Sequence, residues 1–195
     1  MEAVARVAQP EARVRLMELT REYQEHRPEF LDACDRVLSR MHLLGGDEGQ
    51  AFEAEFATYL GVKAVRGVAS GTDALRLAVR AAGLEPGDEV LIQANAFMAA
   101  VEALYDAGVR PVPIDIREHD LGPDPRALAA AVTDRTRGIL VVHLYGLPVD
   151  LTPILELSEK KDLVLIEDCS HAHGATLDGR QVGGFGRLGA FSLGV

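Results

Sequence analysis

Short runs rich in aliphatic and β-branched residues alternate along the chain with helix-like segments. The runs lie at residues 64–68, 89–93, 112–116, 138–144, 163–167 and 188–193. The helix-like segments lie at residues 72–82, 96–107, 125–131 and 151–160. Strands that alternate with helices of about ten residues favour right-handed crossovers and a parallel sheet. We therefore predict an α/β fold with a mostly parallel sheet flanked by helices.

The two most apolar runs, residues 139–142 and 163–166, are expected to be central strands. Runs of this kind suit burial on both faces of a sheet. Ligands of parallel sheets bind at the carboxyl ends of the strands. Functional residues are therefore expected directly after each strand.

The part of the chain before the first run is predicted to be helical. Residues 10–40 carry spaced apolar side chains among many charges, and Pro28 is expected to open a helix that runs towards Arg40. A short amphipathic helix is expected at residues 50–60, and the polar, glycine-rich stretch 40–50 is expected to be a mobile strap. Two parts are predicted, an N-terminal helical segment with its strap at 1–50 and an α/β domain at 51–195.

Composition excludes several classes of protein. The 195 residues include 30 Asp and Glu against 20 Lys and Arg, a net charge of -10 without a basic patch, which argues against nucleic-acid binding. No aliphatic run approaches the roughly 20 residues of a membrane span, and the N-terminus lacks the apolar stretch of a secretory signal. Two cysteines, Cys34 and Cys169, make neither a disulfide framework nor a zinc site. We expect a cytoplasmic protein with reduced thiols, no membrane contact and no bound metal.

The first run is followed by Ser70, Gly71, Thr72 and Asp73 at the start of a helix. A glycine lets the backbone approach a ligand, and free N–H groups at a helix start favour an anion such as a phosphate. An ordinary cap by Ser70 or Thr72 is the alternative. The pattern matches neither a Walker loop nor a dinucleotide-binding glycine motif.

Three further strand ends carry candidate residues. Asp168 has three possible roles: it caps the following turn, binds a metal with His171 and His173, or holds a protonated ligand nitrogen. Phe97 is placed to stack on a planar ring, although a lone Phe more often belongs to the core. Ser192, near the end of the last run, is unremarkable by itself.

Taken together and in this order, these segments resemble the DegT/StrS-type aminotransferases, which are fold type I pyridoxal-phosphate enzymes. The similar strings include residues 52–62, 70–75, 86–90, 142–146, 166–175, 183–186 and 190–192, and the resemblance covers roughly residues 14–195. The family acts mainly on nucleotide-linked keto-sugars, and some members act on keto-inositols. The resemblance thus implies that residues 51–195 form the large, cofactor-binding domain.

The resemblance also implies a role for each candidate residue. Gly71, Thr72 and Asp73 match the phosphate cup, and Ser192 matches a serine that contacts the phosphate. Phe97 matches the aromatic that stacks on the pyridine ring. Asp168 matches the carboxylate that keeps the pyridine nitrogen protonated, and His171 lies where the family has Gln or His near the ring. Asp168 and His171 are the expected catalytic residues.

In the family, a lysine that binds the cofactor covalently follows the serine matched by Ser192, and it would lie just beyond Val195. The chain is therefore expected to be the N-terminal half of a longer enzyme, inactive alone. The resemblance implies that residues 64–68 lie beside an antiparallel strand that follows this lysine.

The whole protein is expected to transfer an amino group from Glu or Gln to a keto-sugar or keto-cyclitol, as a homodimer. A sugar dehydratase of the same family, with histidine in place of the lysine, is one alternative. A non-catalytic short homologue or partner subunit is the other.

Overall fold

The computed structural model describes residues 18–194, which fall into two compact units. One unit extends to Gln50 and the other begins at Ala51. Helix α1 (Thr20–Arg40) lies in the first unit, and helix α2 (Asp47–Leu60) begins there and continues into the second. Among the described helices, none combines the length and the apolar character that crossing a membrane requires.

Helix α1 begins at Thr20, so the prediction that Pro28 opens it is wrong. Pro28 lies inside the helix, where its missing N–H removes one backbone hydrogen bond without ending the helix. Glu22 in the first turn and Arg40 in the last turn complement the helix dipole. Helix α2 begins at Asp47, which leaves only residues 41–46 between the helices. The start of the predicted helical stretch, before residue 18, lies outside the described residues.

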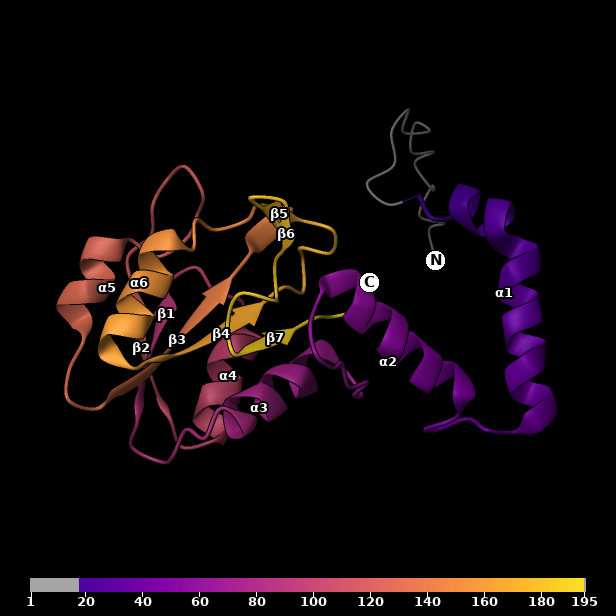
Figure 1. Ribbon diagram of the computed structural model, residues 1–195, viewed down its shortest axis with the longest axis horizontal. Helices are drawn as coiled ribbons and strands as arrows, with labels where there is room; N and C mark the ends of the chain where they lie inside the picture. Colours follow the sequence, from indigo (N-terminus) through magenta and orange to yellow (C-terminus); the bar gives the residue numbers. More distant parts are fainter. Residues whose placement is uncertain (1–17, 195) are drawn as a thin grey trace, which may run out of the picture. The chain divides into compact units, whose positions relative to one another are not determined.

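The second unit contains a five-stranded parallel sheet with the order β2-β1-β3-β4-β7 (Figure 1). The strands in that order are Arg110–Ile114, Glu89–Gln93, Thr136–Val142, Val164–Asp168 and Leu188–Ala190. The predicted parallel sheet is confirmed. Strand β3 is the middle strand and β4 is interior, as their apolar sequences predicted.

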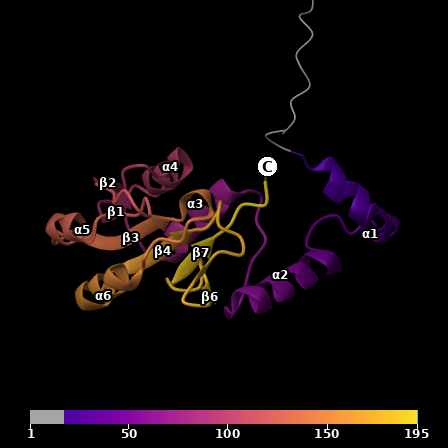
Figure 2. The ribbon, with the colours of Figure 1, turned by 90° about the horizontal axis from the view of Figure 1, so that it is seen from above.

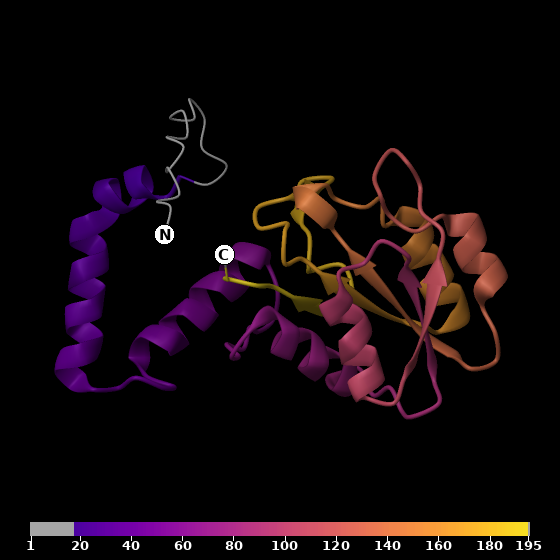
Figure 3. The same ribbon diagram turned by 180° about the vertical axis from the view of Figure 1, so that it is seen from behind.

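Helices cover both faces of the sheet. Helices α3 (Gly71–Ala81) and α4 (Met98–Asp106) pack on one face, and α5 (Pro125–Ala131) and α6 (Thr152–Lys161) pack on the other. Figure 2 shows α4 and α6 on opposite sides, and Figure 3 shows α4 in front of the sheet. Side chains of each strand alternate between the two cores, so Ile166 packs with α3 and α4 while Leu165 packs with α5 and α6.

The predicted strand at residues 64–68 is not a strand. These residues are largely exposed and pair with no described strand, and a strand without a neighbour has no ladder to stabilise it. The predicted strand at 112–116 begins and ends two residues earlier, and the last strand ends at Ala190 rather than at residue 193.

A short hairpin, β5 (Thr176–Leu177) with β6 (Arg180–Gln181), was not predicted. Its turn residues Asp178 and Gly179 have φ angles of 51° and 77°. Asp-Gly is a favoured pair for a two-residue hairpin turn with both residues in this region.

Leu140 lies in β3 with no exposed surface, whereas Leu77 of α3 is 49% exposed. Leu140→Ala is expected to lower the free energy of unfolding by about 2–5 kcal/mol, because it leaves a cavity between two layers. Leu77→Ala removes the same atoms from a solvated position and is the matched control. Urea unfolding measures both, and equal losses would contradict the placement of β3 at the centre of the core.

Candidate functional site

The sequence-predicted site residues gather at the carboxyl ends of the parallel strands. Asp168, the last residue of β4, is paired in register with Val142 of β3 and Ala190 of β7. Val142 and Ala190 belong to the core on the α3 and α4 face. By the alternation of the strand, Asp168 lies on that same face, beside the helices whose first turns carry the other candidates.

The first turn of α3 supplies free backbone donors. Ser70 is the N-cap residue, and its Oγ accepts a hydrogen bond of 3.1 Å from the N–H of Asp73. Of the two capping residues considered, Ser70 is therefore the one used. The N–H groups of Gly71 and Thr72 donate to no described residue, as expected for the start of a helix. Of the backbone N–H groups of Gly71, Thr72 and Asp73, the cap uses that of Asp73 and leaves the other two for an anion.

Gly71 brings Ser192 to this helix start. A Cβ atom built on Gly71 would lie 2.7 Å from Ser192 Cβ and 3.0 Å from Ser192 Oγ, which no side chain tolerates. A glycine is therefore required for the two segments to meet. The hydroxyl of Ser192, which accepts a 3.3 Å hydrogen bond from Gly194, then lies beside the N-terminus of α3. Residues 71 and 192, remote in sequence, form one cradle.

Asp168 is 2% exposed, and its two oxygens have different surroundings. Oδ1 accepts hydrogen bonds from the Ser170 N–H at 3.0 Å and the Ser170 hydroxyl at 2.6 Å, so Asp168 does cap the following turn. Oδ2 accepts none from the described residues. A buried carboxylate with one free oxygen suits a cationic or N–H partner. Capping and ligand binding are therefore compatible roles.

Phe97 is the N-cap residue of α4 and is 65% exposed, so it is not a core residue. Its backbone follows the end of β1, which places the ring at the same edge of the sheet as Asp168. An exposed aromatic at this position is available to stack on a planar ligand.

His171 is exposed and stacks on Tyr145, with ring centroids 6.0 Å apart. Tyr145 lies in the short 3-10 helix Leu144–Gly146 after β3, is 79% exposed and has a φ of 55°. Non-glycine residues held in this region are strained and occur often at functional sites. Sequence reasoning missed Tyr145, although it belongs to one of the strings that resemble the family.

The residues Asp168, His171 and His173 do not form a metal centre among the described residues. His171 stacks on Tyr145, whereas His173 packs against Phe191 at 5.5 Å. The group that does have metal-ligand spacing is His143, Glu167 and Cys169, whose ligand atoms lie within 4.8 Å of one another.

Hydrogen bonds occupy the ligand atoms of His143 and Glu167. His143 Nδ1 accepts the N–H of Val149 at 3.0 Å, so Nε2 carries the proton and donates to Glu167 Oε2 at 3.2 Å. Glu167 also accepts three backbone N–H groups, from Gly183 and Phe185 at 2.8 Å and from Gly186 at 2.6 Å. With no lone pair left for an ion, the cluster is a hydrogen-bond network.

This network determines the ionisation of Glu167. Burial alone would raise its pKa, but hydrogen bonds from His143, Gly186 and Gly183 outweigh burial and hold the pKa below its ordinary value. Burial, together with the charges of Glu167 and Asp168, raises the pKa of the Cys169 thiol. Cys169 is therefore an unreactive neutral thiol, whereas Glu167 is a buried anion.

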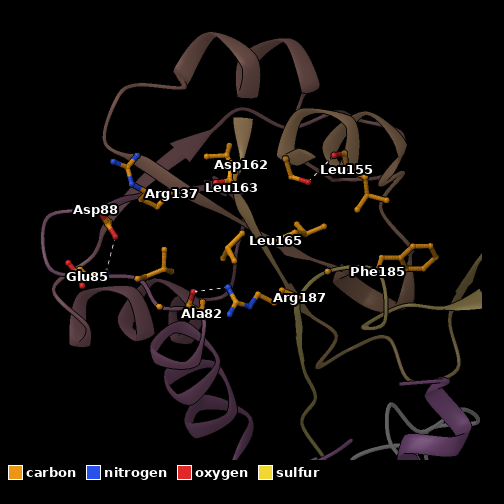
Figure 4. A pocket seen from close by; sticks show the side chains of 15 residues that line it. Ala82, Glu85, Asp88, Arg137, Leu155, Asp162, Leu163, Leu165, Phe185 and Arg187 are labelled. Atoms are coloured by element: carbon orange, nitrogen blue, oxygen red, sulfur yellow. Dashed lines mark hydrogen bonds between the residues drawn. The ribbon is translucent and has the colours of Figure 1, made fainter. Parts of the chain in front are cut away.

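A hollow of about 670 Å³ lies at the opposite end of the strands (Figure 4). Its lining includes Ala82 at the end of α3, Arg137 near the start of β3 and Val164 at the start of β4. Figure 4 shows Arg187 reaching the carbonyl of Ala82 across it. None of the sequence-predicted site residues lines this hollow, so it is not the candidate site.

The DegT/DnrJ/EryC1/StrS aminotransferase family profile matches residues 24–193. The chain belongs to this family. The parallel sheet with helices on both faces is the fold expected from the resemblance.

Curated family members show the extent of the match. A UDP-N-acetyl-3-dehydro-alpha-D-glucosamine 3-aminotransferase of Acidithiobacillus ferrooxidans is 40% identical over 178 residues, 91% of this chain and 48% of the relative. A dTDP-3-amino-3,4,6-trideoxy-alpha-D-glucose transaminase of Streptomyces venezuelae is 41% identical over 181 residues, 93% of this chain and 48% of the relative.

Among solved structures, that of S. venezuelae DesV in complex with a ketimine intermediate has a TM-score of 0.84 and 41% identity. The match covers 87% of this chain and 46% of DesV. The chain therefore spans about half the length of the family members it matches.

The depressed pKa of Glu167 makes its stabilising effect dependent on pH. The ionised network is complete above the ordinary glutamate pKa of about 4.3 and is lost as pH falls through the lower folded value. Glu167→Gln should therefore cost about 3–5 kcal/mol of unfolding free energy at pH 7, and less as the pH falls below 4. Urea unfolding from pH 7 to pH 3.5, with Glu159→Gln at an exposed position of helix α6 as control, measures the difference. A cost that does not change with pH would contradict an ionised Glu167.

Proposed function

We propose that the whole protein is a pyridoxal-phosphate-dependent aminotransferase that transfers an amino group from Glu or Gln to a nucleotide-linked keto-sugar or a keto-cyclitol. The observation that carries the proposal is that two features lie at the same edge of the sheet. One is the free Oδ2 of Asp168, and the other is the anion cradle formed by Gly71 and Ser192. Family membership supplies the reaction class, and the sugar substrates in the names of the relatives support the substrate class.

The described residues fit the cofactor by their chemistry. The N–H groups of Gly71 and Thr72, with the hydroxyls of Thr72 and Ser192, would hold the phosphate at a helix N-terminus. The Asp73 N–H is already used by Ser70, so we assign Asp73 a supporting place in that turn. Residues 51–195 are the proposed cofactor-binding domain.

The ring of the cofactor has two candidate partners. Phe97 would stack on one face, and Asp168 Oδ2 would accept a hydrogen bond from the protonated pyridine nitrogen. When bound, the cofactor supplies an electron sink for the amino-transfer chemistry. Asp168 would maintain the charge on which that sink depends, and His171, which stacks on Tyr145 just after β4, is the second proposed catalytic residue.

Asp168→Asn is the sharpest test, because it keeps the shape and an oxygen for the Ser170 turn but removes the charge. Turnover of the whole protein with glutamate and a nucleotide-linked keto-sugar should fall by at least about 100-fold. Exposed Asp134→Asn is the control and should leave turnover unchanged.

Unchanged turnover in Asp168→Asn would overturn the role of Asp168. Product analysis separates the reaction classes, because an aminotransferase leaves an amino-sugar whereas the family's dehydratase alternative leaves a deoxy-sugar. If the whole protein turns over neither substrate class and binds no pyridoxal phosphate, the non-catalytic alternative is correct.

We infer further that the whole protein is a homodimer. Phe97, Met98, Tyr145 and Leu147 are exposed apolar residues that follow β1 and β3 at the carboxyl edge, where a second subunit would cover them. Sedimentation equilibrium should give twice the monomer mass. An active monomer would contradict this inference.

We also infer a cytoplasmic location, which rests on two cysteines that are both free thiols, Cys34 exposed and Cys169 buried.

A further inference from the structure

The Glu167 network has no assigned role in the proposed function. Glu167 lies on the face of β4 opposite to Asp168, so it does not face the candidate cofactor site. Its four hydrogen bonds nevertheless reach two other segments: the loop after β3, and the segment 183–186, which extends from Gly183 beside Phe191 to Gly186 at the hollow on the opposite side of the sheet. His143, which follows β3, joins it to the N–H of Val149, and the amides of Gly183, Phe185 and Gly186 join it to the segment that leads into β7.

The backbone around the segment 183–186 is packed too closely for a side chain at Gly186 or Gly189. A Cβ on Gly186 would lie 2.6 Å from the carbonyl oxygen of Leu165, and a Cβ on Gly189 would lie 2.4 Å from that of Gly183. Backbone amides therefore hold this segment against β4, where Glu167 accepts three of them, while the ring of Phe185 packs on the core beneath the Arg180 guanidinium.

Gly183 connects this segment to the candidate phosphate cradle. A Cβ on Gly183, whose φ is +86°, would lie 2.5 Å from Cζ of Phe191, so the backbone of Gly183 lies directly against that ring. Phe191 is also held edge-on by Phe56, with centroids 5.2 Å apart. The next residue is Ser192, which meets Gly71. A displacement of Gly183 would therefore be transmitted to Ser192 through one side chain.

We infer that Glu167 is a positioning residue of the candidate cofactor site: its buried carboxylate fixes the backbone of Gly183, and through Phe191 it sets Ser192 against the N-terminus of α3. This inference rests on the proposed function for its ligand, the phosphate of the cofactor. Glu167 would thus affect the binding of the phosphate although it does not contact the phosphate. A residue that only stabilises the fold would affect the binding of all ligands of the site alike.

The test compares two probes, pyridoxal 5′-phosphate and pyridoxal, on the cofactor-free whole protein. Glu167→Gln places an NH₂ donor among backbone N–H groups that are also donors. Some of their hydrogen bonds are therefore lost, and part of the 183–186 segment is released. The substitution should weaken binding of the phosphorylated probe by about 10–100-fold, the loss expected for one hydrogen bond to a charged group, and change pyridoxal binding by less than about twofold. In a Ser192→Ala background the same substitution should have little further effect on the phosphorylated probe. Glu159→Gln is the matched control for both probes.

Hydrogen exchange of the cofactor-free protein provides a readout that needs no ligand. Glu167→Gln should increase exchange at Gly183, Phe185 and Gly186 and also at residues 191–192. If Glu167→Gln does not melt cooperatively, the binding of the two probes is compared in Phe191→Leu instead. This substitution removes the ring contact with Gly183 but keeps the Glu167 network.

Equal weakening of both probes, no weakening of either, or full additivity with Ser192→Ala would overturn the inference. So would exchange that increases at 183–186 and stays unchanged at 191–192. If the unsubstituted protein binds no pyridoxal 5′-phosphate, the proposed function fails, and the exchange experiment alone decides whether Glu167 positions Ser192.

Discussion

The buried carboxylate of Glu167 is the group on which the packing of the loops around β4 depends. An ionised carboxylate inside a protein costs several kcal/mol unless its oxygens are fully hydrogen-bonded. Here one imidazole and three amides satisfy them, and those donors come from two loops that are far apart in sequence. The chain can therefore bury Glu167 only when both loops are in place, which makes β4 and these two loops a cooperative unit.

The parallel sheet determines where that unit faces. Because every strand runs in the same direction, the ends of β1, β3, β4 and β7 meet at one edge, and alternation along β4 separates the two carboxylates. Glu167 holds loops on the α5 and α6 face. Asp168 keeps one oxygen free on the α3 and α4 face, where Gly71 and Ser192 meet. Of these two adjacent residues, Glu167 therefore has a structural role and Asp168 has the proposed chemical role.

The sequence predicted the parts of the fold that depend on local pattern. Strand β1 and the Pro-initiated helix α5 have the predicted bounds, whereas β4 begins and ends one residue later than predicted and β3 two residues earlier. Predictions failed where long-range pairing or context decides. Residues 64–68 have strand-like side chains but no neighbouring strand among the described residues. Helix α1 begins eight residues before Pro28 and continues through it. The β5–β6 hairpin had a signal in Asp178-Gly179 that was not used.

Site residues divide in the same way. Asp168, Phe97 and the Ser70 cap follow strands or precede helices, so strand-end reasoning found them. Three of the four partners of Glu167 are backbone amides 16 to 19 residues further along the chain, which side-chain patterns do not reveal.

A crystal structure of the whole protein with pyridoxal phosphate tests the central claim most directly. We predict that the phosphate lies at the N–H groups of Gly71 and Thr72 beside Ser192, and that the pyridine nitrogen lies at Asp168 Oδ2. A phosphate bound elsewhere, or an Asp168 Oδ2 that faces no ligand nitrogen, would contradict it.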